Sequence, residues 1–150
     1  MRIPFIQILA CLEVALLAPA EAQSLPTSFT GTWAIDLRTR AEKKEKVECG
    51  TAIFKLSQAG SRIVGDHSMA TPRCGRMNEG GEGTVKGLVL GSTAVLTVTS
   101  GRNGQIVLGS AKIVGDSLHW QVSEEIKAGE PEEGDPGLIL QSGVLRRERP

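Results

Sequence analysis

The stretch from Gly83 to Ser123 constrains the fold most strongly, because apolar and polar residues alternate along it. Ala94, Leu96 and Val98 form one apolar run with a period of two, and Leu118, Trp120 and Val122 form another. This period is typical of strands with one buried face. Turn-forming residues separate the runs at Gly91-Ser92, Arg102-Asn103-Gly104 and Gly115-Asp116. Such residues reverse hairpins, so the stretch predicts a β-meander.

Strand patterns continue on both sides of the meander. Residues 31–38 place Trp33, Ile35 and Leu37 on one face, and residues 51–58 and 61–69 flank Ala59-Gly60 as a hairpin. Residues 138–147 read as a final strand, which makes eight strands in an all-β chain. An eight-stranded antiparallel up-and-down barrel leaves no exposed strand edge, although the periodicity alone also allows a sandwich.

Three segments lack a strand period. Residues 38–48 form a charge run of mixed sign, which predicts a solvated loop or one short helix. We expect residues 70–82 to form a loop, and the acidic, glycine- and proline-rich residues 124–137 to form another.

The amino-terminal residues 1–22 have the pattern of a signal peptide. Arg2 precedes an apolar run, and Ala20-Glu21-Ala22 matches the small-x-small cleavage site. A membrane anchor would need a longer uninterrupted apolar run. An alternative is a lipobox at residues 8–11 with a lipidated Cys11. We therefore expect a periplasmic or secreted protein with one domain over residues 23–150.

Charge and cysteines limit the partners and the chemistry. The chain has 17 basic and 17 acidic residues, and removing residues 1–22 leaves it nearly neutral, which argues against nucleic acid or an anionic membrane as a partner. In an exported chain Cys49 and Cys74 predict a disulfide, with two free buried thiols as the alternative. With only His67 and His119 besides these cysteines, no recognised zinc spacing exists.

Catalytic motifs are not found in the sequence. Neither histidine stands in a nucleophile-base motif, and the acidic residues cluster in the segment expected to be a loop. His119 alternates outward beside Trp120, and an inward His67 is best explained as a core histidine. We expect a non-enzymatic protein without a cofactor or metal.

Gly31-Thr32-Trp33 on the first strand and Arg146-Arg147 on the last resemble the lipocalin and avidin class of barrels. The resemblance implies that Trp33 closes one barrel end and that Arg146 or Arg147 covers it. A barrel of eight strands either fills with side chains or holds one small ligand. The candidate ligand-facing residues are Phe54, Leu56, Leu96, Val98, Leu118 and Trp120. The first hypothesis is therefore a carrier or sensor of a small apolar molecule.

A second resemblance is to bacterial periplasmic inhibitors of secreted metalloproteases. Ser24, Leu25-Pro26, Gly31, Trp33, Cys49 and Cys74 follow the order of features in that family. The resemblance implies that an amino-terminal arm with Ser24, Leu25 and Pro26 enters a protease cleft. The alternative hypothesis is therefore a protein-binding module, and we expect a monomer in both cases.

Overall fold

The computed structural model describes residues 28–130 and 137–149. The predicted signal peptide, Cys11 and the arm residues Ser24, Leu25 and Pro26 lie outside the described residues.

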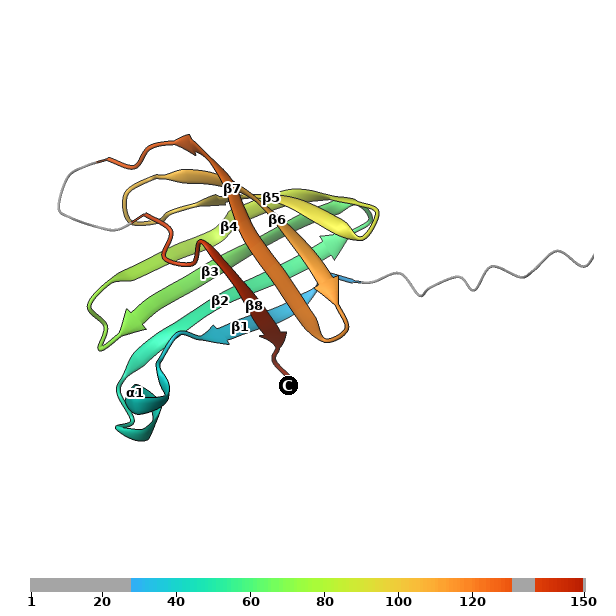
Figure 1. Ribbon diagram of the computed structural model, residues 1–150. Coiled ribbons are helices and arrows are strands. Elements are labelled where there is room, and N and C mark those ends of the chain that lie inside the picture. The colour runs from blue at the N-terminus through green and yellow to red at the C-terminus, as the bar shows by residue number, and fades with distance from the viewer. Residues whose placement is uncertain (1–27, 131–136, 150) are drawn as a thin grey trace, which may run out of the picture.

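Eight antiparallel strands close into one barrel in simple chain order, so the predicted fold class is confirmed. The strands are β1 (Gly31–Asp36), β2 (Cys49–Ala59), β3 (Arg62–Pro72), β4 (Met77–Leu90), β5 (Thr93–Thr99), β6 (Ile106–Val114), β7 (Ser117–Lys127) and β8 (Ser142–Arg147), with one helix, α1 (Arg40–Lys44). Figure 1 shows β1 beside β8, where the barrel closes, and α1 protruding from one end. Closure pairs every strand on both edges and explains why the alternating pattern is stable without a second sheet.

The alternation of the sequence becomes the inner and outer face of the barrel wall. Strand β5 is the clearest case, because Ala94, Leu96 and Val98 are buried and the threonines and valine between them are partly exposed. The inward residues of all eight strands join one hydrophobic core.

Two expected loops are partly strands. Strand β3 continues to Pro72 and β4 begins at Met77, so only a short turn remains of the loop expected over residues 70–82. The glycines in β4 interrupt the alternation of apolar and polar residues, so the sequence does not indicate a strand there. The strand is defined by its pairing with β3. Likewise β7 extends through Lys127, because Glu124 pairs with Leu108 of β6.

The charge run between β1 and β2 contains the one short helix that the sequence allowed. Thr39 caps α1 by accepting a hydrogen bond from the Glu42 backbone amide, and the Glu42 carboxylate accepts one from the Thr39 backbone amide at 2.7 Å. Hydrogen bonds from the Thr39 backbone amide and the Thr39 hydroxyl to the Glu42 carboxylate lower the pKa of Glu42. No helix within the described residues is long and apolar enough to span a membrane.

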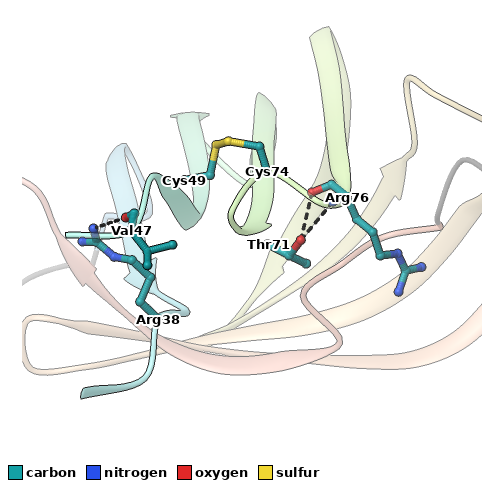
Figure 2. Close-up of a disulfide and its surroundings, with 6 residues drawn as sticks. All are labelled: Arg38, Val47, Cys49, Thr71, Cys74 and Arg76. Atoms are coloured by element: carbon teal, nitrogen blue, oxygen red, sulfur yellow. Dashed lines mark hydrogen bonds between the residues drawn. A yellow bond between two sulfur atoms is a disulfide. The ribbon is translucent and has the colours of Figure 1, made fainter. Parts of the chain in front are cut away.

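The predicted disulfide joins Cys49 at the start of β2 to Cys74 in the β3–β4 turn, with 5.3 Å between the Cα atoms. Figure 2 shows its surroundings, where the Arg38 guanidinium donates to the Val47 carbonyl and the Thr71 hydroxyl binds the Arg76 backbone. Both cysteines have positive φ, a backbone conformation that non-glycine residues rarely adopt, so the bond joins two unusual backbone positions.

Replacing both cysteines with alanine should lower the free energy of unfolding by about 3 kcal/mol, because the bridge closes a loop of 25 residues in the unfolded chain. Denaturant unfolding of the two proteins measures the difference. The native barrel should persist in the variant, and an unchanged midpoint would show that the disulfide does not constrain the unfolded chain.

Candidate binding sites

The barrel has two distinct ends. We call the end where β1 begins the arm end; the turns at 60–61, 91–92 and 115–116 surround it. We call the opposite end the disulfide end; it contains α1, the Cys49–Cys74 bridge and the segment before β8. Figure 1 shows β1 beginning at the arm end, and α1 at the disulfide end.

The first-strand tryptophan lies inside the barrel toward the arm end. Trp33 is fully buried, and its indole nitrogen donates to the Phe29 carbonyl at 2.8 Å. The Arg147 guanidinium carbon lies 4.1 Å from the centroid of the Trp33 ring, a cation-π distance. Of the two arginines that the resemblance offered for this role, the structure places Arg147 over the ring, whereas its neighbour Arg146 pairs with Ala34; both arginines are exposed.

Arg147 also holds the chain just before β1. Its guanidinium donates to the Ser28 carbonyl at 2.8 Å and to the Thr30 carbonyl. Gly31 lies beneath this group with φ of 139°, and a Cβ atom there would stand 2.7 Å from an Arg147 nitrogen. The positive φ is the reason that this position favours glycine, because the flexible end of the Arg147 side chain can shift away from a Cβ atom.

Phe29 was not among the residues expected to form a site, yet its side chain is part of the packed arm end of the barrel. Its side chain is almost fully buried, and its amide donates to the Gln58 side-chain oxygen at 2.9 Å. The backbone amide of Gln58 donates to the Thr30 hydroxyl at 2.9 Å. Residues 28–30 are consequently fixed to β2, β1 and β8, and the chain before them starts from a rigid base.

The six residues predicted to face the interior are all buried. Phe54, Leu56, Leu96, Val98, Leu118 and Trp120 are between 0% and 5% exposed. The Phe54 and Trp120 rings meet edge to face with centroids 5.2 Å apart, a favourable aromatic geometry. Trp120 also lies against Gly109, where a Cβ atom would be 2.3 Å from the ring. These side chains pack against one another as a core.

The segment before β8 fills the disulfide end instead of extending the last strand, which corrects the prediction of one strand over residues 138–147. Leu138 and Leu140 are each 4% exposed, and the Leu140 carbonyl accepts a hydrogen bond from the Trp120 indole at 3.0 Å. The Leu140 amide lies 3.4 Å from the Met69 sulfur. The leucines at alternate positions suggested a strand, but they close the barrel end as a plug.

A buried polar network lies among these apolar side chains. His67 is 1% exposed, and its Nε2 lies 2.8 Å from the Asn78 side-chain oxygen. The Asn78 amide donates to the Ser100 hydroxyl at 2.8 Å. Since Asn78 donates through nitrogen, its oxygen accepts, which places the His67 proton on Nε2. His67 is therefore a hydrogen-bonded core histidine.

Thr84 connects this network to the barrel wall. Its hydroxyl oxygen lies 3.3 Å from His67 Nδ1 and 2.8 Å from the Gly81 carbonyl oxygen. With the histidine neutral, the single hydroxyl proton serves only one of these acceptors at a time. Burial lowers the pKa of His67 below its ordinary value, and the Asn78 hydrogen bond and Asp66 charge oppose that effect.

His119 lies on the outer face of β7 and is exposed, as its place in the alternation predicted. Within the described part of the chain, no three residues among the histidines, cysteines, aspartates and glutamates come together as a group that could hold a metal. No protein-family model, curated protein or solved structure matches the chain.

Trp33→Ala should lower the free energy of unfolding by about 3–5 kcal/mol, because it empties the core beneath Arg147.

Arg147→Met should lower the free energy of unfolding by about 1 kcal/mol through the lost cation-π contact and carbonyl hydrogen bonds. The matched control Arg146→Met changes a neighbouring exposed arginine and should stay within about 0.5 kcal/mol of the parent. Equal losses for the two arginine variants in denaturant unfolding would contradict this assignment.

Lowering the pH should weaken the barrel through His67. The unfolded chain takes up the His67 proton at a higher pH than the folded chain, because the pKa of His67 is lowered on folding. The contribution of neutral His67 to the free energy of unfolding is therefore complete above pH 6.5 and declines as the pH falls below that value. His67→Gln removes the titration and keeps an amide able to donate to Asn78. Between about pH 7.5 and pH 5.5 its free energy of unfolding should fall less than that of the parent.

The control for this measurement is His119→Gln, which changes the exposed histidine. It should keep the parental slope of stability against pH. A parental slope in His67→Gln as well would show that His67 is not the group responsible.

Proposed function

We propose that this chain is an exported, non-enzymatic protein-binding module that acts through its amino-terminal arm and the adjoining arm end of the barrel. The observation that carries the proposal is the packed interior. Trp33, Phe54 and Trp120 lie within the barrel with at most 2% exposure. A protein that binds from its outside needs no interior space.

A small apolar ligand in the interior, the first hypothesis from the sequence, would have to displace these rings. Phe54 contacts the Trp120 ring, and Trp120 is tied to the Leu140 carbonyl, so moving one disturbs the others. Close-packed cores resist such rearrangement. This favours the protein-binding alternative.

The contacts of residues 28–30 support a role for the arm. Arg147 binds the carbonyl oxygens of Ser28 and Thr30, and Gln58 accepts from the Phe29 amide. A segment that leaves a rigid base has fewer orientations to lose when it is inserted into a partner. A proline in the arm, Pro26, restricts it further, and both effects lower the entropic cost of binding.

The resemblance to periplasmic metalloprotease inhibitors gives the proposal a specific partner class. In this form of the proposal, Ser24, Leu25 and Pro26 enter the cleft of a secreted zinc protease while the arm end of the barrel blocks its rim. Insertion by a chain end requires that the end be free, so inhibition should depend on cleavage after residue 22.

The test compares the chain beginning at Gln23 with one beginning at Ser28, assayed for inhibition of secreted zinc proteases from the same source. The shorter chain keeps the Ser28 carbonyl that Arg147 binds, so its barrel should be as stable as the parent. We expect it to lose inhibition by at least about a hundredfold, because the inserted contacts are gone.

A control variant, Lys44→Ala on α1, changes the opposite end of the barrel and should inhibit like the parent. Equal inhibition by the long and short chains would exclude the arm mechanism. If neither chain inhibits, the protease would be the wrong partner class.

A further inference from the structure

Unusual backbone conformations gather at the disulfide end of the barrel. In the described part of the chain, the non-glycine residues with positive φ are Lys46 and Cys49, which follow α1, and Arg73 and Cys74 in the β3–β4 turn. A positive φ is unfavourable for a residue that carries a Cβ atom, and residues in such conformations cluster at functional sites. The disulfide joins the two segments that hold all four residues.

We call residues 39–49 and 71–76 together the disulfide knob, and Figure 1 shows its helix α1 protruding from the barrel. Contacts besides the disulfide hold its two segments together. The Arg73 amide donates to the Glu48 carbonyl at 2.8 Å, and the Arg73 guanidinium lies 3.2 Å from the Glu45 carboxylate. The backbone of the knob is thus fixed in the free protein, so little ordering is needed when a partner binds.

The disulfide knob is basic, although the whole chain has equal numbers of basic and acidic residues. Its six basic residues are Arg40, Lys43, Lys44, Lys46, Arg73 and Arg76, and its three acidic residues are Glu42, Glu45 and Glu48. A local excess of one sign attracts partners of the opposite sign, even where the net charge of the protein is zero.

Most carboxylates of the knob are already engaged within the protein. Glu42 accepts hydrogen bonds from the Thr39 amide and the Thr39 hydroxyl at 2.7 Å and 2.8 Å. Glu45 pairs with Arg73. Among the described residues, no cation pairs with the third carboxylate, that of Glu48.

Four cations of the knob remain available to a partner. Arg40, Lys44, Lys46 and Arg76 are exposed, and none of them forms an ion pair with another described residue. Figure 2 shows the Arg76 side chain extending away from the disulfide. The knob therefore offers more free positive charge than its own carboxylates can neutralise.

The spacing on α1 fits an extended acidic chain. Arg40 and Lys44 are four positions apart, so they share one face of the helix and lie about 6 Å apart along its axis. Alternate side chains on one face of an extended chain are about 6.6 Å apart. Two carboxylates at alternate positions can therefore meet Arg40 and Lys44 together.

The chemistry of the knob favours carboxylates over nucleic acid. The knob contains no phenylalanine or tryptophan, and the whole chain has no tyrosine. Sites for single-stranded nucleic acid combine cations with aromatic side chains on which the bases stack. Arginine side chains such as Arg40 match the planar geometry of a carboxylate and can bind both of its oxygens.

We propose that the disulfide knob binds an extended acidic segment of another protein, with carboxylates at alternate positions over Arg40 and Lys44. Lys46 and Arg76 enlarge the basic surface around this pair. The knob lies at the opposite end of the barrel from the amino-terminal arm, so this site is independent of the proposed arm mechanism. Because its ion pairs are exposed, we expect weak binding that falls as salt is added.

The first experiment is an NMR titration of the nitrogen-15-labelled chain beginning at Gln23, with a capped six-residue peptide that alternates glutamate and serine. The peptide should shift the backbone signals of residues 39–49 and 71–76 and leave those of residues 28–31 unmoved. Salt at about 0.5 M should abolish the shifts. The same peptide with glutamine in place of glutamate should not bind, because it has no carboxylates.

The second experiment removes two charges from the knob. Arg40→Gln combined with Lys44→Gln should weaken peptide binding about three- to tenfold, because each exposed ion pair contributes modestly. The matched control, Arg62→Gln combined with Lys86→Gln, removes an exposed arginine and an exposed lysine from the barrel wall. It changes the net charge equally and should bind like the parent. Equal weakening in both proteins would show attraction by net charge alone and overturns the proposal.

The third experiment replaces Cys49 and Cys74 with alanine, which keeps every charge of the knob. The barrel spectrum should persist, and peptide binding should weaken at least about threefold, because the two segments must then be ordered on binding. Unchanged affinity would mean that the fixed backbone has no part in the site, and the proposal would fail.

A thymidine tetranucleotide, whose three phosphates match the charge of the peptide, distinguishes the class of partner. We expect it to bind more weakly than the peptide. Tighter binding by the nucleotide would identify a nucleic-acid site and overturns the proposal. A peptide that leaves the signals of the knob unmoved at millimolar concentration, or that shifts residues 28–31 instead, also overturns it.

Discussion

The pairing of β1 with β8 is the interaction on which the rest of the structure depends, because it turns an eight-stranded meander into a closed barrel. The direct register is short: Trp33 lies opposite Arg147 and Ala34 opposite Arg146. Side-chain contacts reinforce it. Arg147 lies over the Trp33 ring and binds the backbone just before β1, so one residue of the last strand joins the first strand in two ways. Closure thereby also fixes residues 28–30.

Closure also decides how the interior is used. Once the strands form a ring, the rings of Trp33, Phe54 and Trp120 must share one narrow space, and the aromatic contact between Phe54 and Trp120 shows that they fill it. The plug formed by Leu138 and Leu140 completes the filling at the disulfide end. With the interior filled in this way, the ends and the outer wall are the surfaces of the barrel that face solvent.

The buried His67 network is the main polar exception in the core. Its Nε2 is hydrogen-bonded to Asn78 and its Nδ1 lies 3.3 Å from the Thr84 hydroxyl, while burial lowers the pKa of the ring. Such a group holds neighbouring strands in one arrangement, because any shift would leave a buried polar atom without its partner. It also makes stability sensitive to pH near neutrality, in a barrel whose exposed ion pairs contribute little.

The sequence by itself determined the period of two, the turns, the disulfide between Cys49 and Cys74 and hence a small all-β domain, because these depend on local residue order and on cysteine chemistry. It also indicated that Trp33 and a terminal arginine belong together. Only the tertiary structure decided that Arg147 covers the ring, that Phe29 and Gln58 anchor the chain before β1, and that the segment before β8 turns inward. It also decided that Glu124 lies beside Leu108. These features depend on strand register and barrel closure, which bring together residues that are far apart in the chain and that no local pattern connects.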